Sequence, residues 1–152
     1  IITNNNNGVI YFFGNGASAS ISDHLATDLT KTCKIQSRTF NNSNLLTCFS
    51  NDYGYENWVV EALGAYADEH DLVFLISSSG SSPNIINGAN YCVENAIKLV
   101  CLSGFKSGNP LTKLGDVNVW VDSTYYNFVE MVHHIWLVAL VDKISVGNEQ
   151  LK

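Results

Sequence analysis

Basic residues are scarce in this chain. Eight lysines and arginines stand against fourteen aspartates and glutamates among 152 residues, which gives a net charge of −6. This balance argues against nucleic acid or an anionic membrane as the main partner, because both attract basic surfaces. It remains compatible with a small anionic ligand, since backbone N–H groups bind anions without any net positive charge.

Long apolar runs are also lacking. The most apolar segment, residues 128–141, contains Glu130, His133 and His134. It is shorter than the roughly 20 residues needed to span a bilayer, so we expect no membrane-spanning helix. Charged residues make up only 14% of the chain and hydrophobic residues 46%, which is typical of a folded globular domain. We expect residues 1–152 to form a single domain.

Paired cysteines and a secretory signal are absent as well. The four cysteines are Cys33, Cys48, Cys92 and Cys101. None belongs to a C-x-x-C pair, so we interpret them as small, mostly buried side chains in a reducing, cytoplasmic compartment. The first residues, IITNNNNG, have no basic region and no long apolar stretch, and we therefore expect no signal peptide.

Apolar and helical patterns alternate along the chain. Apolar runs predict strands at residues 9–13, 72–76, 97–102 and 117–121, with a weaker one at 35–39. Helical patterns lie at residues 18–31, 57–66, 83–94 and 127–142. Near-continuous apolar strands suit a parallel sheet covered on both faces, and the alternation favours right-handed crossovers. The sequence therefore predicts an α/β fold, an open five-stranded parallel sheet of the flavodoxin-like or Rossmann-like kind.

In such sheets, ligands bind beyond the carboxyl ends of the strands. Four segments follow the predicted strands at this edge: residues 14–18, 77–82, 103–108 and 122–126. We expect the functional site among them.

The second of these segments is rich in serine. After Ile76, five of the next six residues are serine, in the stretch FLISSSGSSPN. Ser82 before Pro83 is a good N-cap for a helix, which accounts for one serine. Hydroxyls beside the free N–H groups of a helix N-terminus also form a phosphate site; a polar loop with a single cap is the alternative. The loop has neither the G-x-x-x-x-G-K-[ST] pattern nor a lysine, so it is not a nucleoside-triphosphate loop.

The first segment is a glycine turn, GNGASA, that fits the pattern G-x-G-x-x-G/A. A dinucleotide site also requires an acidic residue after the second strand. Phe40, Asn41 and Asn42 stand there instead, which disfavours a dinucleotide.

Three motifs in order and spacing, GNGASASISDHLATDL, NDYGYE and SSSGSSPN, resemble the sugar isomerase (SIS) domain family. The similarity covers residues 9–142 and is strongest to the sedoheptulose 7-phosphate (phosphoheptose) isomerase branch. It implies a five-stranded parallel sheet, a sugar-phosphate substrate and homotetramers with active sites between subunits. Such proteins usually carry an extra N-terminal helix, which we expect this chain to lack.

By position, the resemblance also implies individual site residues. Those implied to contact substrate are Asn15, Gly16 and Ala17, then Asn51 and Asp52, then Ser77, Ser78, Ser79 and Ser82. The implied cofactor is zinc, with His24 as a ligand. Asp28 falls where the family has a glutamate that binds metal and acts as catalytic base. The family usually has glycine in place of Ala17.

Isomerisation of a ketose phosphate moves a proton between adjacent carbons, which requires a base, an acid and a group that stabilises the enediolate. His24 and Asp28 are four residues apart and share one helix face, so they can bind one ion. A surface histidine paired with an aspartate is the alternative.

The last predicted helix departs from the family. The resemblance implies a glutamine and, eight residues later, a histidine, where this chain has Val129 and Leu137. Neither side chain can bind metal or transfer a proton. His133 lies four residues from each on the same stripe, and we expect it to supply the missing histidine as acid or ligand. A helix histidine bonded to Glu130 or a neighbour is the alternative.

Two functions follow from these features. The first is a sugar-phosphate isomerase; the second is a module that binds a phosphosugar, or bridges partner proteins, without turnover. We also expect a homo-oligomer, a tetramer or a dimer, because apolar residues of the last helix cover more than one face. These residues are Phe128, Val129, Val132, Trp136, Leu137 and Leu140.

Overall fold

A computed structural model describes residues 8–149. Its five strands are β1 (Ile10–Gly14), β2 (Ser37–Thr39), β3 (Leu72–Ser77), β4 (Lys98–Ser103) and β5 (Val117–Trp120). They form one sheet in the order β2-β1-β3-β4-β5, and every neighbouring pair is parallel. The predicted fold class is therefore confirmed, and all five strands lie within two residues of their predicted bounds.

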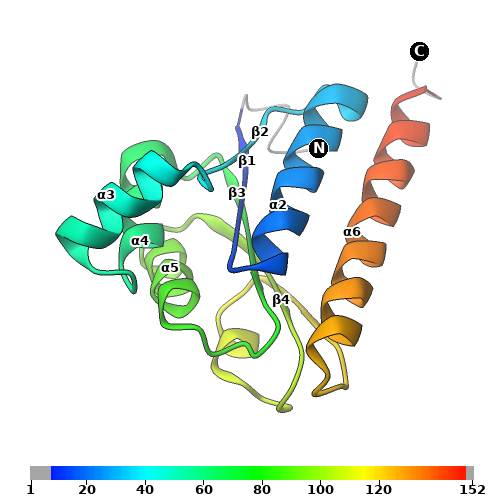
Figure 1. Cartoon of the computed structure of the whole chain (residues 1–152). Helices are drawn as coiled ribbons and strands as arrows, with labels where there is room; N and C mark the ends of the chain where they lie inside the picture. The colour runs from blue at the N-terminus through cyan, green and yellow to red at the C-terminus, as the bar shows by residue number, and fades with distance from the viewer. Residues whose placement is uncertain (1–7, 150–152) are drawn as a thin grey trace.

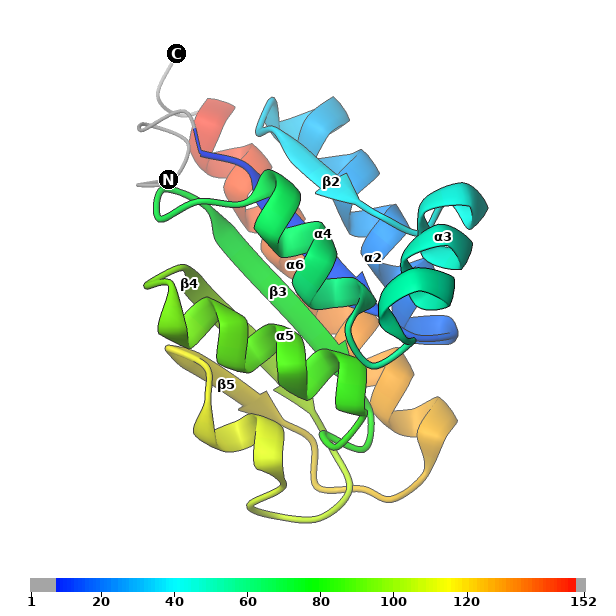
Figure 2. The same cartoon turned by 90° about the vertical axis from the view of Figure 1, so that its left-hand side faces the viewer.

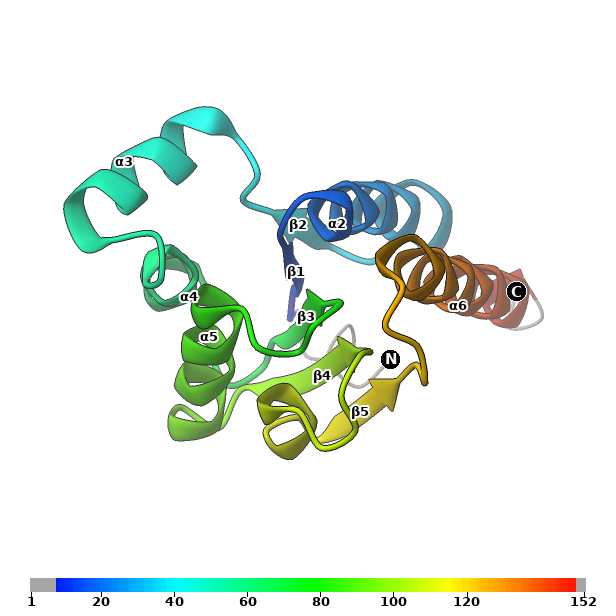
Figure 3. The same ribbon diagram turned by 60° about the horizontal axis from the view of Figure 1, so that its bottom comes forward.

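Helices cover both faces of the sheet. They are α2 (Ala17–Asp28) with a π-helical turn after it (Leu29–Cys33), α3 (Ser43–Tyr53), α4 (Trp58–Tyr66), α5 (Pro83–Glu94), a 3₁₀ turn (Pro110–Lys113) and α6 (Tyr126–Glu149). Figures 2 and 3 show α4 and α5 on one face and α2 and α6 on the other. No helix within residues 8–149 is long and apolar enough to cross a bilayer.

The helix α3 was not predicted. Its sequence, SNLLTCFSNDY, has many polar residues and buries none fully, so its short apolar stripe is a weaker signal than that of a packed core helix. Leu45, Leu46 and Phe49 are only partly buried against the core. Figure 1 shows α3 standing away from the body of the domain.

Alternation along β1 divides the core into two layers, because successive strand residues point to opposite faces. Phe13 packs with Trp58 and other side chains from the α4 and α5 side. Phe12 packs against Phe74 and lies with Leu25 of α2 and Leu137 of α6. Apolar side chains on both faces explain why the strand sequences are nearly continuous hydrophobic runs.

Strand register brings the carboxyl ends to one edge. Gly14 pairs with Ile76, and Ser77 pairs with Ser103. In the sheet, β2 lies on one side of β1, and β3, β4 and β5 follow one another on its other side. The order reverses between β1 and β3, which is where ligands bind in flavodoxin-like sheets. Figure 3 looks toward this edge.

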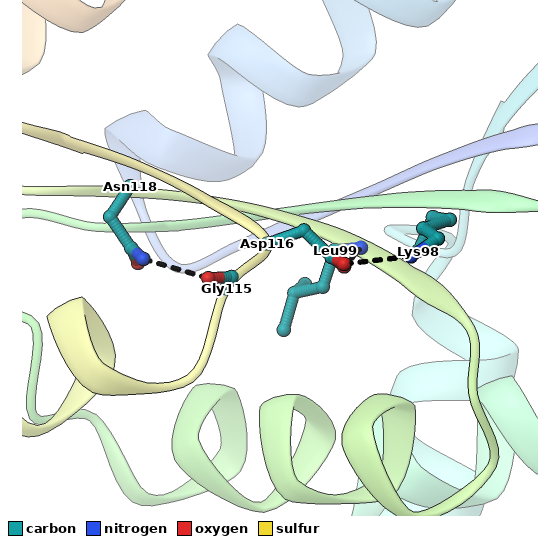
Figure 4. Close-up of polar contacts among 5 residues, drawn as sticks. All are labelled: Lys98, Leu99, Gly115, Asp116 and Asn118. Atoms are coloured by element: carbon teal, nitrogen blue, oxygen red, sulfur yellow. Dashed lines mark hydrogen bonds and ion pairs between the residues drawn. The ribbon is translucent and has the colours of Figure 1, made fainter.

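The entry to β5 is fixed by polar contacts near the opposite edge (Figure 4). Asp116 accepts hydrogen bonds from the Lys98 ammonium at 2.8 Å and from the Leu99 backbone N–H at 2.9 Å. Asn118 donates to the Gly115 carbonyl at 2.8 Å. The Lys98 hydrogen bond, followed by that of Leu99, holds the pKa of the Asp116 carboxyl below its ordinary value. These contacts anchor the outermost strand to β4.

Candidate active site

A pocket of about 210 Å³ lies at the switch point between β1 and β3. Its lining residues are Asn15, Ser18, Ile76, Ser77, Ser78, Ser79, Ser82, Tyr126 and Glu130. Three of the four predicted edge segments contribute to it. A larger hollow of about 620 Å³ runs beside α2 and the edge strand β2. We place the site by topology rather than by size, because the larger hollow is lined by the sides of these elements and not by the loops at the switch point.

The serine loop, residues 77–82, forms one wall of the pocket. Ser77 and Ser78 are buried, and the hydroxyls of Ser77 and Ser82 lie 3.2 Å apart. Ser82 occupies the N-cap position of α5, before Pro83, but its side chain makes no capping hydrogen bond. Its hydroxyl therefore faces the loop, and the positive end of the α5 dipole is directed at the pocket.

Gly80 gives the serine loop its turn. Its φ is +63°, and a Cβ at this position would collide with the side chain of Asn109. Asn109 is buried and donates to the Ser103 hydroxyl and to the Gly104 carbonyl, each at 3.1 Å. The Gly104 N–H in turn donates to the Ser78 carbonyl at 2.9 Å. The loop is thus held from below by the segment that follows β4.

The glycine turn forms the facing wall through Asn15. Asn15 and the buried Asn84 exchange two hydrogen bonds of 3.0 Å, and the Tyr55 hydroxyl donates to Asn15 at 2.9 Å. Gly16 and Ala17 are exposed at the start of α2 and do not line the pocket. Of the three residues predicted in this turn, the structure brings only Asn15 to the serine loop.

Glu130 was missed by sequence reasoning. It projects from α6 into the pocket lining, where its carboxylate accepts a hydrogen bond from the Ser78 hydroxyl at 3.3 Å. It is the one carboxylate among the lining residues. Its position near the start of a helix that follows the last predicted edge segment was the available signal.

His24 and Asp28 lie outside this pocket. The His24 Nε2 atom is 3.1 Å from the Asp28 carboxylate, as the four-residue spacing predicted. On the other side of the ring, His24 Nδ1 lies 2.7 Å from Nε2 of His134. The two imidazoles meet edge to face, with centroids 4.9 Å apart and planes at 84°.

Within the single chain, the histidine of α6 that contacts His24 is His134, and His133 lies against the segment after β4. The stripe of residues 129, 133 and 137 is the face of α6 that packs inward, so Val129, His133 and Leu137 are all buried. His133 Nε2 lies 3.1 Å from the Ser103 carbonyl oxygen, and Nδ1 has no hydrogen-bond partner among the described residues. Burial lowers the pKa of this imidazole. One residue further along, His134 faces α2 instead.

Asn51 and Asp52 are at the exposed carboxyl end of α3. The Asn51 amide donates to the Asp52 carboxylate at 2.8 Å, and neither residue lines the pocket. A single chain therefore does not bring this pair to the serine loop.

The sequence profile of the SIS domain matches residues 2–104, more than half of the chain. The chain belongs to the SIS domain family. This SIS domain is 32% identical over 136 residues to a probable phosphoheptose isomerase of Thermoplasma volcanium, with 85% of this chain and 68% of the relative covered. It is 30% identical over 151 residues to phosphoheptose isomerase of Helicobacter pylori strain HPAG1, covering 95% of this chain and 78% of the relative.

The solved structure of phosphoheptose isomerase from Neisseria gonorrhoeae has the same fold. It matches 95% of this SIS domain and 80% of its own chain, with a TM-score of 0.89 and 26% sequence identity. The family resemblance drawn from the three motifs is thereby confirmed.

The residues implied for zinc fit the ion only in part. A catalytic zinc site takes three protein ligands and a structural one takes four. Among residues 8–149, no three His, Cys, Asp or Glu side chains are grouped to hold one ion. Val129 is buried beside Gly104, and Leu137 is buried in the apolar cluster between the sheet, α2 and α6. What this SIS domain retains are two imidazole nitrogens facing each other and the Asp28 carboxylate behind His24.

Proposed function

We propose that this SIS domain binds a sugar phosphate in the serine-loop pocket and interconverts its ketose and aldose forms, as a phosphoheptose-type isomerase. The observation that carries the proposal is the cluster of serine hydroxyls at the N-terminus of α5, located at the switch point between β1 and β3. The identity to phosphoheptose isomerases over most of the chain supports the same substrate class.

The phosphate is assigned to the serine loop. Hydroxyls of Ser77, Ser78, Ser79 and Ser82 line the pocket, and each can donate to a phosphate oxygen. The α5 dipole adds attraction for the anion at close range. Because the chain carries a net negative charge, this local arrangement must supply the affinity that overall charge does not.

Proton transfer is assigned to carboxylates. Asp28 is the base implied by the family, and Glu130 is the carboxylate that lines the pocket of the same chain. His133 remains a predicted proton donor. Because its ring is buried and contacts the Ser103 carbonyl oxygen, we expect it mainly to stabilise the segment that follows β4. To move the proton between C1 and C2 of the sugar, the carboxylate must lie within hydrogen-bond reach of both positions.

We further propose that a homo-oligomer, a tetramer or a dimer, completes the site. The pocket of about 210 Å³ is smaller than the roughly 300–1,000 Å³ usual for small-molecule sites. Apolar side chains of α6 remain exposed, with Phe128 at 56%, Ile135 at 62% and Trp136 at 42%. A second copy that covers this face buries them and can bring Asn51, Asp52 or Asp28 toward a neighbouring serine loop.

Zinc also belongs to the proposal, with His24 and Asp28 as the implied residues of this chain. A bound zinc ion acts as a Lewis acid that polarises a carbonyl oxygen. The chain's own groups position the substrate: the serine hydroxyls hold the phosphate, and Asn15 and Tyr126 border the sugar. We place the protein in the cytoplasm, in keeping with its free thiols at Cys48, Cys92 and Cys101.

An isomerase assay on a panel of ketose phosphates, beginning with sedoheptulose 7-phosphate, tests the function. NMR detects the aldose product directly, and calorimetry measures binding of the same compounds. Turnover supports the isomerase. Binding without turnover supports the alternative of a phosphosugar-binding module, which the apolar Val129 and Leu137 favour. Neither binding nor turnover on any sugar phosphate overturns both.

A further inference from the structure

We propose that Tyr55 is a positioning residue of the serine-loop pocket. It acts through Asn15, whose amide it orients so that one N–H is left to donate to an oxygen of the sugar. The Tyr55 hydroxyl donates to Asn15 Oδ1 at 2.9 Å, and Asn15 lines the pocket whereas Tyr55 does not. This role rests on the proposed function and concerns the second tyrosine of the NDYGYE motif, to which that function assigns no part.

The hydrogen-bonding capacity of the Asn15 amide is nearly filled within the chain. An amide oxygen accepts two hydrogen bonds and an amide nitrogen donates two. Oδ1 of Asn15 accepts from the Tyr55 hydroxyl and from Asn84 Nδ2, and Nδ2 of Asn15 donates to Asn84 Oδ1. One N–H of Asn15 therefore has no partner among the described residues. A ligand in the pocket meets Asn15 as a donor, so the ligand atom that pairs with it must be an acceptor.

Tyr55 decides which way this amide points. The pair formed by Asn15 and Asn84 is symmetric, because it stays complete when both amides turn over and exchange nitrogen for oxygen. The hydroxyl of Tyr55 makes the two orientations unequal, since it donates to Oδ1 of Asn15. Without this hydroxyl, a turned amide that presents oxygen to the ligand becomes equally accessible.

The backbone around Tyr55 is anchored, although the side chain is 48% exposed. Gly54 has a φ of +86°, and the Asn57 N–H donates to the Gly54 carbonyl at 3.0 Å, which closes a turn around Tyr55. Asn87 of α5 donates to the Glu56 carbonyl at 2.9 Å. Tyr55 belongs to neither layer of the core, so removal of its hydroxyl should leave the fold intact.

The free N–H of Asn15 is assigned to the sugar rather than to the phosphate. Asn15 is on the wall that faces the serine loop, and the serine hydroxyls already supply donors for the phosphate. A carbonyl or hydroxyl oxygen of the sugar chain then accepts from Asn15. Loss of the Tyr55 hydroxyl should therefore affect the binding of a sugar phosphate but not the binding of phosphate itself.

Calorimetry with sedoheptulose 7-phosphate and with inorganic phosphate, on the whole chain, tests this role. Tyr55→Phe should bind the sugar phosphate about 2–10-fold more weakly, because the population of the correct amide orientation halves and one hydrogen bond is lost. Inorganic phosphate should bind as it does to the wild type. Tyr53→Phe is the matched control: Tyr53 is an exposed tyrosine of the same motif whose hydroxyl has no partner among the described residues, and both affinities should stay unchanged.

A second comparison tests whether Tyr55 acts through Asn15. Asn15→Ala should weaken binding of the sugar phosphate by about tenfold. Adding Tyr55→Phe to this variant should change the affinity no further, since the residue through which Tyr55 acts is gone. Circular dichroism checks that each variant folds. If Asn15→Ala does not fold, the comparison of the two ligands with Tyr55→Phe decides alone.

Failure of this role is distinguishable from failure of the proposed function. A Tyr55→Phe chain that binds the sugar phosphate as tightly as the wild type, or that loses affinity equally for inorganic phosphate, overturns the role of Tyr55 and leaves the proposed function standing. Additive effects of the Asn15 and Tyr55 substitutions do the same. A wild-type chain that binds neither ligand overturns the proposed function and the role of Tyr55 together.

Discussion

The side-chain amides of Asn15 and Asn84 hydrogen-bond each other in both directions, with nitrogen–oxygen distances of 3.0 Å. The pair ties the glycine turn after β1 to the first turn of α5, across 69 residues of sequence. Asn84 is buried, so both of its polar atoms depend on this contact. The two walls of the pocket are therefore set at a fixed separation by one pair of side chains.

Replacing Asn84 with alanine should weaken both folding and ligand binding. The change removes both hydrogen bonds of the pair and leaves the Asn15 amide N–H without its acceptor, while the Asn15 oxygen keeps the Tyr55 hydroxyl. Such a loss costs about 1–3 kcal/mol of the free energy of unfolding. Urea unfolding measures this cost, and calorimetry with a sugar phosphate measures the accompanying loss of affinity. Asn90→Ala, at an exposed position of the same helix, should change the free energy of unfolding by less than about 0.5 kcal/mol. Equal stabilities of the two variants would contradict the structural role of the pair.

The serine loop should lose phosphate affinity when its hydroxyls are removed. The double variant Ser79→Ala, Ser82→Ala removes two donors from the pocket lining, and we expect binding of a sugar phosphate to weaken by about 1–3 kcal/mol. Calorimetry is the measurement. Thr47→Ala, on the exposed side of α3, is the matched control for loss of a hydroxyl. Unchanged affinity in the double variant would remove the phosphate from this loop.

Substitutions of Glu130 and His133 should affect different properties, turnover for Glu130 and the free energy of unfolding for His133. Glu130→Gln keeps the shape of a pocket residue but removes its charge, and we expect turnover to fall by about a hundredfold, the typical scale for a general acid or base. His133→Ala should instead lower the free energy of unfolding by about 1–3 kcal/mol, because it leaves a cavity where a fully buried ring stood and removes one of the two hydrogen bonds to the Ser103 carbonyl, which keeps the Val121 N–H. Asp28→Asn, assayed alongside, tests the family-implied base.

Kinetics and unfolding of each variant decide between these roles. A His133→Ala protein of unchanged stability and hundredfold lower turnover would restore His133 as proton donor. A Glu130→Gln protein with wild-type turnover would leave Asp28 as the base.

Stability should fall in acid partly through Asp116. Its pKa is lowered in the folded chain by the Lys98 and Leu99 hydrogen bonds, so its contribution is present above the unfolded pKa of about 3.9 and is lost as pH falls through the lower folded value. Both partners of the ion pair are largely exposed, so Asp116→Asn should cost about 1 kcal/mol or less at pH 7. Urea unfolding at several pH values should show the two proteins converging below pH 4. A constant difference down to that range would assign the effect to another group.

The sheet and most helices were predictable because buried parallel strands carry their signal in the local sequence. Leu72–Ser77 and Lys98–Ser103 are apolar on both faces, and the serine loop stands directly after one of them. The rotation of α6 was not predictable in this way. Residues 128–141 are apolar around most of the helix, so periodicity did not distinguish the stripe of His133, which packs inward, from that of His134, which meets α2.

The same limit applies to contacts between distant residues. Glu130 meets Ser78, and Asn84 meets Asn15, only because strand order brings β1, β3 and α6 together. The position of Glu130 near the start of the helix after the last edge segment is a weak signal, which a solvated helix carboxylate would also give. These contacts depend on the order of the strands in the sheet, and local sequence patterns do not predict them.

Gly80 and Asn109 hold the serine loop in its turn without help from a ligand. Association then requires no preceding rearrangement of the loop, since the hydroxyls already occupy their positions when the phosphate arrives. The observed rate of binding should rise linearly with sugar-phosphate concentration in a single phase. Because each sugar phosphate meets the same preformed serine loop, their association rates should be similar. Differences in affinity between sugar phosphates should then arise from their dissociation rates.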